Sequence, residues 1–130
     1  MNITCKVDIT PEQISDQFVT AFEGGSNYWL RGHDLISPDR KTLTDSIWYA
    51  DHKLYDGEFV IRLAYDDPEK DDEGAGSGRK NINQFDVERG LNIMADKCPH
   101  QFGLLRGEDG DAITADVFLQ CVLFGDVVYG

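Results

Sequence analysis

The chain has 130 residues, of which 41% are hydrophobic and 11% aromatic, and this predicts a single soluble domain over 1–130 with its own core. Twenty-four acidic and twelve basic residues give a net charge of −12, which disfavours direct contact with nucleic acid or anionic membranes and favours basic partners. The first residues lack a basic region leading into an apolar stretch, so we expect no signal peptide and a cytoplasmic location.

The N-terminal segment predicts a strand followed by a helix. Apolar and polar residues alternate over 3–9, the period of a half-buried strand. Thr10, Pro11 and Gln13 then form the signature of a helix N-terminus with a capping box. Apolar residues recur at helical spacing as far as Phe22, and Gly24 predicts a left-handed helix end.

The middle of the chain predicts a β-hairpin. We expect irregular chain up to about residue 40, then an extended segment over 42–50. Asp56 and Gly57 are typical of a hairpin turn, and the alternation over 59–65 predicts a strand antiparallel to that segment. Residues 66–78 hold six acids, one lysine and no large apolar side chain, so they predict a mobile acidic loop.

Two more helices are expected in the C-terminal half, over 83–98 and 111–124. Gly90 lies inside the first, where a close packing contact would explain it, and Pro99 ends that helix. Gly125 ends the second, and the last five residues either add an edge strand or fold back on the core. The resulting order β-α-β-β-α-α predicts an α+β fold, with an antiparallel sheet of about three to four strands and helices on one of its faces.

The candidate chemical groups do not form a recognisable catalytic or metal-binding pattern. His33, His52 and His100 share no metal-ligand spacing and are expected in exposed loops. The three cysteines are widely spaced and odd in number, and there is no nucleophile elbow or phosphate-binding glycine loop. We therefore expect no metal, no cofactor and no enzymatic activity.

The turn at residues 24–29 is open to two interpretations. It can be a helix stop, with Tyr28 and Trp29 packing back on the first helix. It can also be a contact site, because aromatic side chains dominate interface hot spots and glycine-rich backbone can meet a ligand. In the second case the ligand-binding residues would be Gly24, Gly25, Ser26, Asn27, Tyr28, Trp29 and Arg31.

Three segments carry a resemblance to a known group of proteins. They are residues 14–29, which end in the EGGSNYW turn, the ADVFLQ motif with the rest of the C-terminus at 115–130, and the helix over 83–98 containing Gly90, Leu91, Met94 and Ala95. These segments resemble small phage and prophage proteins that have no assigned activity. The resemblance implies a viral accessory protein acting in a bacterial cytoplasm, and it supplies no catalytic residues.

The charge and the resemblance together support a first functional hypothesis. The protein would be a non-enzymatic phage counter-defence protein that blocks a basic, nucleic-acid-handling host complex, as anti-CRISPR and DNA-mimic inhibitors do. Its partner-binding residues would be Tyr28, Trp29, Asp66, Asp67, Asp71, Asp72, Glu73, Asp109, Asp111 and Asp116. The alternative hypothesis is a protein that sequesters a nucleotide signal at the 24–29 turn. A third hypothesis is a structural or regulatory phage protein that forms a dimer through its C-terminal segment. The acidity could also serve solubility alone.

Overall fold

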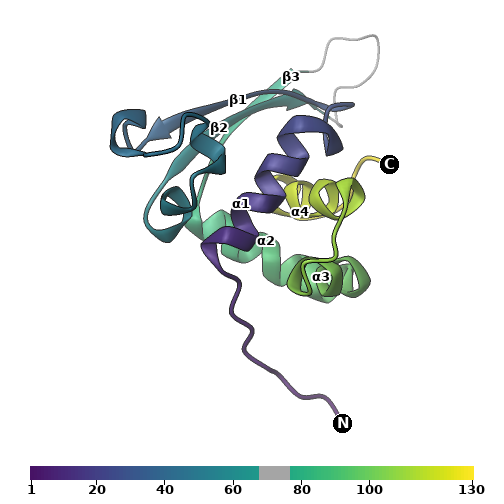
Figure 1. Cartoon of the computed structure of the whole chain (residues 1–130). Helices are drawn as coiled ribbons and strands as arrows, with labels where there is room; N and C mark the ends of the chain where they lie inside the picture. The colour runs from purple at the N-terminus through teal and green to yellow at the C-terminus, as the bar shows by residue number, and fades with distance from the viewer. Residues whose placement is uncertain (68–76) are drawn as a thin grey trace.

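The structure, a computed structural model that describes residues 1–67 and 77–130, is an α+β fold with helices on one face of a three-stranded antiparallel sheet (Figure 1). The strand order is β1-β2-β3. The strands are β1 (Leu30–Ser37), β2 (Val60–Asp66) and β3 (Ser77–Asn83), and the helices are α1 (Pro11–Thr20), α2 (Gln84–Lys97), α3 (Pro99–Arg106) and α4 (Ala112–Phe124). The predicted fold class is confirmed, although the order of elements differs.

Helix α1 begins as the sequence predicts but ends differently. The Gln13 side chain accepts a hydrogen bond from the Thr10 backbone N–H at 2.9 Å, and Thr10 Oγ1 accepts one from the Gln13 N–H at 3.1 Å. A π-helical turn, Ala21–Gly25, follows the helix. Gly24 has a φ of 177°, so the predicted left-handed stop is wrong. The nearby Gly25 is required by close approach, because a Cβ there would lie 2.6 Å from the Ala112 carbonyl oxygen.

The central strand β2 confirms the predicted strand, but its predicted hairpin partner is wrong. It pairs with β1, in register Leu35↔Ile61, and with β3, in register Ile61↔Ile82. The predicted irregular region therefore contains a strand, and residues 42–50 are coil with short 3-10 turns. The β-branched and aromatic residues near Trp48 favoured a strand only locally, and a buried carboxylate overrides that preference.

Asp51 is the buried carboxylate that fixes the 42–50 coil. It is 6% exposed and accepts hydrogen bonds from the backbone N–H groups of Thr44 at 2.7 Å, Asp45 at 3.1 Å and Lys53 at 2.9 Å. These backbone donors hold the pKa of Asp51 below its usual value, against the opposing effect of burial. Backbone N–H groups that donate to the Asp51 side chain are unavailable for hydrogen bonds to a neighbouring strand, so this segment forms irregular coil and not a strand.

The predicted strand over 3–9 is also wrong. These residues form no regular structure, and Ile3 is 79% exposed. Alternation of apolar residues produces a strand only where a neighbouring strand supplies backbone partners, and the structure places none beside this segment among the described residues. The predicted acidic loop at 66–78 falls, for residues 68–76, outside the described residues. Asp66 belongs to β2, and Ser77 and Gly78 belong to β3.

The two C-terminal helices that the sequence predicts are confirmed. Asn83 caps α2, Asp111 caps α4, and Gly125 ends α4 with a φ of 71°. A Cβ on Gly90 would lie 2.6 Å from the Cα of Val122, so the predicted close contact joins α2 to α4. The sequence analysis missed α3, because Pro99 both ends α2 and occupies the first turn of a new helix.

Aromatic and aliphatic side chains from α1, the sheet and α4 form the core. The Phe18 ring lies 5.3 Å from the Phe118 ring and 5.2 Å from the Tyr55 ring. The C-terminal residues fold back on this core, where Tyr129 stacks on Trp29 at 5.8 Å. No helix in the described part of the chain is long and apolar enough to cross a membrane.

Candidate functional site

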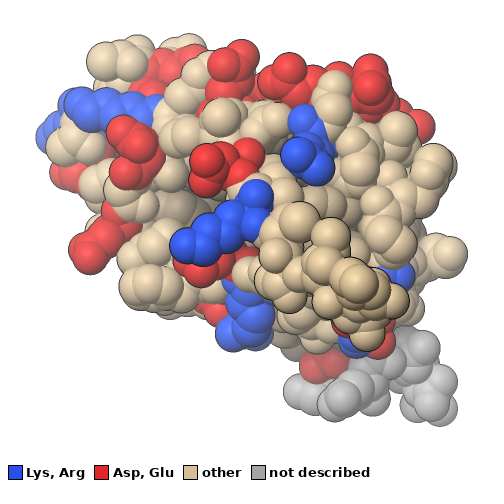
Figure 2. Space-filling view, turned by 90° about the horizontal axis from the view of Figure 1, so that it is seen from below, with Lys and Arg blue, Asp and Glu red and all other residues tan. Residues whose placement is uncertain are grey.

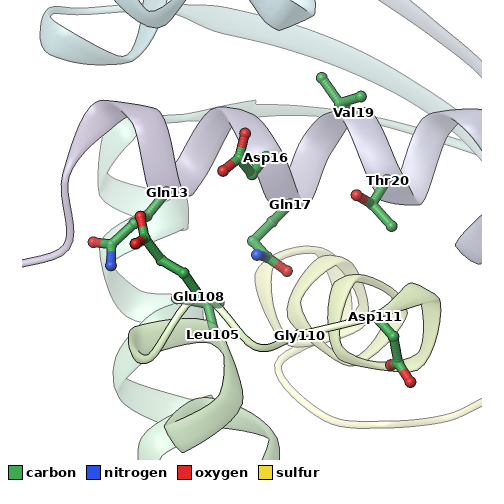
Figure 3. Close-up of a pocket in the computed structure, with 9 residues that line it drawn as sticks. All are labelled: Gln13, Asp16, Gln17, Val19, Thr20, Leu105, Glu108, Gly110 and Asp111. Atoms are coloured by element: carbon green, nitrogen blue, oxygen red, sulfur yellow. The ribbon is translucent and has the colours of Figure 1, made fainter.

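An acidic cleft of about 270 Å³ lies between α1 and the loop that joins α3 to α4 (Figure 3). One side of α1 forms one wall, and the end of α3 with its following loop forms the other. The cleft is lined by Gln13, Asp16, Gln17, Val19, Thr20, Leu105, Glu108, Gly110 and Asp111. Three of these residues are acids and none is basic, so the lining presents negative charge beside two apolar side chains.

The shape of the cleft follows from how the two walls are joined. The Gln13 side-chain amide donates a hydrogen bond to the Arg106 carbonyl oxygen at 3.1 Å, which ties the start of α1 to the end of α3. The chain then reverses through Glu108, whose φ of 59° lies in the left-handed region that non-glycine residues rarely adopt. In Figure 3 the Glu108 side chain rises from this loop toward α1.

Asp111 has a double role at the mouth of the cleft. Its Oδ1 accepts hydrogen bonds from the backbone N–H groups of Ile113 at 3.0 Å and Thr114 at 3.2 Å, so it caps α4. The carboxylate also offsets the positive end of the α4 dipole. The helix N-terminus beside the cleft is therefore already neutralised by the chain itself.

The acids of the cleft have no basic partner within the described residues. The ion pairs that the structure describes join Arg31 to Asp66, Arg89 to Asp86 and Lys97 to Asp126. Asp16, Glu108 and Asp111 are exposed, as are the neighbouring Glu12 and Asp109. The cleft thus lies in a group of five acids whose charge the described chain leaves without an ion pair. We call these five residues, Glu12, Asp16, Glu108, Asp109 and Asp111, the acidic patch.

Charge is distributed unevenly over the surface. On the face seen in Figure 2, acidic side chains gather along the upper edge, and basic side chains are interspersed with further acids over the rest of the face. The net charge of −12 is therefore the total of surface regions that differ in their proportions of acidic and basic side chains. Any electrostatic contact must be local, and the acidic patch is one place where it can form.

The 24–29 turn has a different character, because its polar side chains converge on buried Asp116. The carboxylate of Asp116 accepts hydrogen bonds from Ser26 Oγ at 2.8 Å, Tyr28 OH at 2.5 Å and Trp29 Nε1 at 2.7 Å. A fourth comes from Gln120 Nε2 at 3.0 Å. We call these five residues the Asp116 cluster. Burial and the adjacent Asp116 carboxylate raise the pKa of Tyr28 to about 12.

This arrangement corrects two of the predicted partner-binding residues. Trp29 is fully buried and Asp116 is 8% exposed, so neither presents a surface to a partner in this structure. The amphipathic pattern of α4 did not indicate a buried acid. The burial of Asp116 is explained by three hydrogen-bond donors that lie some 90 residues earlier in the chain. Of the predicted aromatic pair, only Tyr28 is exposed, at 51%.

The remaining predicted site residues fall in several places. Asp109 and Asp111 belong to the acidic patch. Asp66 pairs with Arg31, whose guanidinium also donates to the carbonyl oxygens of Asn27 and Tyr28. This pairing holds the pKa of the Asp66 carboxyl below its usual value. Asp67 directly follows β2 and is partly buried, and the predicted residues Asp71, Asp72 and Glu73 lie outside the described residues.

The predicted nucleotide-binding residues line neither the acidic cleft nor a second cleft of the structure. Ser26 and Trp29 are buried, and Gly25 is held against α4. Gly24 and Asn27 are exposed, while Arg31 is engaged with the turn itself. A second, larger cleft of about 660 Å³ lies between residues 4–9 and α2, and neither cleft is lined by a residue of the turn.

His33 is more enclosed than the sequence analysis predicts. It lies on β1 with its ring stacked on Phe22 at 4.2 Å, and the Trp48 and Tyr49 rings lie within about 6 Å of it. Its buried Nδ1 has no hydrogen-bond partner among the described residues. Desolvation lowers the pKa of His33, with the nearby Asp34 carboxylate opposing the shift. No group of three metal-ligating side chains occurs in residues 1–67 and 77–130.

Comparisons with known proteins yield no relative. No family model, no curated protein and no solved structure matches this chain.

Proposed function

We propose that this protein is a non-enzymatic, phage-encoded counter-defence protein that binds and blocks a basic surface of a nucleic-acid-handling complex in the host cytoplasm. The observation that carries the proposal is the acidic patch, whose five exposed carboxylates have no ion pair within the described residues. Charges left without partners in the free protein are available to a partner of opposite sign.

An electrostatic contact between exposed charges contributes more to the rate and selectivity of association than to affinity. Each exposed charge pair contributes only about 0.2–1 kcal/mol, because water and salt screen it. Several like charges on one surface, however, steer a basic partner and speed its encounter. The same field repels nucleic acid, so the protein would compete for a nucleic-acid-binding groove without binding nucleic acid itself. The resemblance of the turn, the Gly90 helix and the C-terminus to phage proteins supports the viral origin.

A capture experiment tests this proposal. Tagged protein is incubated with host lysate at about 50 and about 300 mM salt, and bound proteins are identified by mass spectrometry; the electrostatic contact should weaken at the higher salt. The captured complex is then purified, and its binding to labelled DNA or RNA is measured by fluorescence anisotropy with and without this protein. We expect the protein to displace the nucleic acid.

A matched pair of variants makes the experiment specific. Neutralising Asp16, Glu108 and Asp109 to their amides should abolish displacement. Neutralising Glu58, Glu88 and Asp96, three exposed acids elsewhere, changes the net charge equally and should preserve it. Equal inhibition by both variants would contradict a role for the acidic patch, and failure of the native protein to inhibit any captured complex would contradict the proposed function.

The alternative, sequestration of a nucleotide at the 24–29 turn, has less support. The hydroxyl and indole donors of the turn are already hydrogen-bonded to Asp116, and Arg31 is bonded to Asp66 and to backbone carbonyls. An anionic ligand would have to displace Asp116 or Asp66. Thermal-shift screening against a nucleotide panel tests this alternative, which a clear stabilisation would revive.

A further inference from the structure

Gln17 is a largely buried residue whose side-chain amide forms no hydrogen bond with the described chain. The residue is 9% exposed, and its side chain has no hydrogen-bond partner among the described residues. Figure 3 shows its amide pointing from α1 toward the loop that carries Gly110, into the acidic cleft. The Gln17 amide atoms are not among the buried unpaired atoms of the described residues, so they reach the open space of the cleft. An amide that no described residue pairs, on a side chain otherwise enclosed by the protein, is available to a ligand there.

The cleft offers acceptors on both walls. The Gln17 amide extends from α1 toward the Gly110 loop, and the Glu108 carboxylate rises from the opposite loop toward the start of α1, beside Gln13 (Figure 3). Asp16 and Asp111 add carboxylates, and both are exposed. Leu105 is 1% exposed and Val19 projects from α1 away from the loop (Figure 3), so the groups that a ligand would meet in the cleft are mainly polar. The volume of about 270 Å³ is just below the range typical of sites for drug-sized ligands.

The geometry points to a guanidinium group, and we propose that the acidic cleft binds an arginine side chain of the partner. A metal ion fits poorly, because no three ligating side chains converge in the described residues. A guanidinium carries five N–H donors in a planar fork and no acceptor. It can therefore donate to the Gln17 amide oxygen on one wall and to the Glu108 carboxylate on the other. A lysine ammonium, as a compact point charge, matches this arrangement less well.

This inference rests on the proposed function and names one contact within it. The acidic patch would attract a basic surface over a distance, and the cleft would select one arginine on that surface. Gln17 provides the selectivity for arginine over other cations, because its amide accepts a hydrogen bond that requires a donor in one direction, whereas charge alone does not.

Nuclear magnetic resonance of the full ¹⁵N-labelled chain tests the cleft directly. The probes are capped arginine (N-acetyl-arginine methylamide), capped lysine and capped citrulline, which has the shape of arginine without its charge. We expect capped arginine to shift the Gln17 side-chain amide and the Glu108 backbone signals saturably, with a dissociation constant on the order of millimolar. Capped lysine should bind more weakly, and capped citrulline should produce no saturable shift. Absence of a saturable shift with capped arginine, or equal shifts with citrulline, would overturn the inference.

Two variants separate the cleft from general electrostatics. Gln17→Met removes the amide while keeping the volume and should weaken capped-arginine binding about tenfold. Glu108→Gln should weaken it roughly two- to fivefold. Glu88→Gln removes one exposed charge from α2 and should have no comparable effect. If Glu88→Gln weakened binding as much as Glu108→Gln, the contact would be diffuse and the cleft assignment wrong.

Failure of the arginine contact and failure of the proposed function give different experimental results. If the native protein and Gln17→Met inhibit the captured complex equally, and no probe binds, the arginine contact fails while the proposed function stands. If capped arginine binds the cleft but no complex is inhibited, the cleft is a guanidinium site and the proposed function fails. An arginine-containing peptide from the captured partner, compared with its arginine-to-citrulline form, distinguishes a protein side chain from a free guanidinium compound.

Discussion

The Asp116 cluster and the acidic cleft are built from the same kinds of side chain but differ in pairing. In the Asp116 cluster, one buried carboxylate receives four hydrogen bonds from Ser26, Tyr28, Trp29 and Gln120. In the cleft, the amide of the largely buried Gln17 and the carboxylates around it leave acceptors unused. Paired polar groups hold a fold together, and unpaired ones at an opening remain available to a ligand. From this difference we propose that the first region serves stability and the second serves binding.

The largest expected effect is the loss of Asp116. Asp116→Ala leaves the buried donors of Ser26 and Trp29 without an acceptor, so the free energy of unfolding should fall by about 3 kcal/mol or more. Urea unfolding followed by tryptophan fluorescence measures it. Asp126→Ala is the control, since that exposed acid lies just beyond α4, and it should change stability by less than about 0.5 kcal/mol. A small effect of Asp116→Ala would remove the distinction between the two regions.

Tyr28 tests the exposed side of the same cluster. Tyr28→Phe removes the hydroxyl that donates to Asp116 at 2.5 Å, and should cost about 1.5 kcal/mol. Because the pKa of Tyr28 is raised to about 12, the folded state retains the proton above the unfolded-state value. The stabilisation is therefore complete below about pH 10 and is lost as the pH rises toward 12. Unfolding between pH 8 and pH 11 should show a smaller alkaline loss in Tyr28→Phe than in the native chain, and identical slopes would contradict this.

His33 is an intermediate case, because it is enclosed by aromatic rings but one of its nitrogens is unpaired. Its lowered pKa means that the unfolded state binds the proton more readily than the folded state. Stability should therefore fall as the pH drops below about 6.5, until the folded-state pKa has been passed. His33→Phe should remove that part of the slope and, by eliminating the unpaired Nδ1, should stabilise the protein by about 1 kcal/mol. His52→Phe, at an exposed position, controls for the substitution itself.

The sequence predicted elements whose signals are local. The capping residues Thr10 and Gln13, the stop at Gly125 and the alternation in β2 each act within a few residues, and the structure confirms them. The close contact at Gly90 was also predicted, because a glycine inside a helix carries a cost that packing must offset. Local chemistry therefore identified three helices, one strand and the fold class.

What the sequence could not predict depends on contacts between distant residues. The coil at 42–50 depends on Asp51, and the burial of Trp29 depends on Asp116, which lies 87 positions later in the chain. The cleft joins residues near 17 with residues near 108, a separation that no periodicity reveals. Asp109 and Asp111 were predicted from their charge alone. Gln17 was missed, because a glutamine on a helix carries no signal until its burial is known.

The smallest effect on stability is expected for Glu108→Gln, and this variant gives the clearest test of the difference between the acidic cleft and the Asp116 cluster. Glu108→Gln removes a charge that has no partner within the described residues, so stability should change by less than about 0.5 kcal/mol, the range usual for surface positions. Removing one member of a like-charged group also relieves repulsion, which makes a slight gain the expected sign. Urea unfolding and displacement of nucleic acid from the captured complex are measured on one preparation of Glu108→Gln. We expect its stability to be unchanged and its inhibition of the captured complex to be weakened. Loss of both together would mean that Glu108 supports the fold as Asp116 does, and the assignment of the cleft to binding would fail.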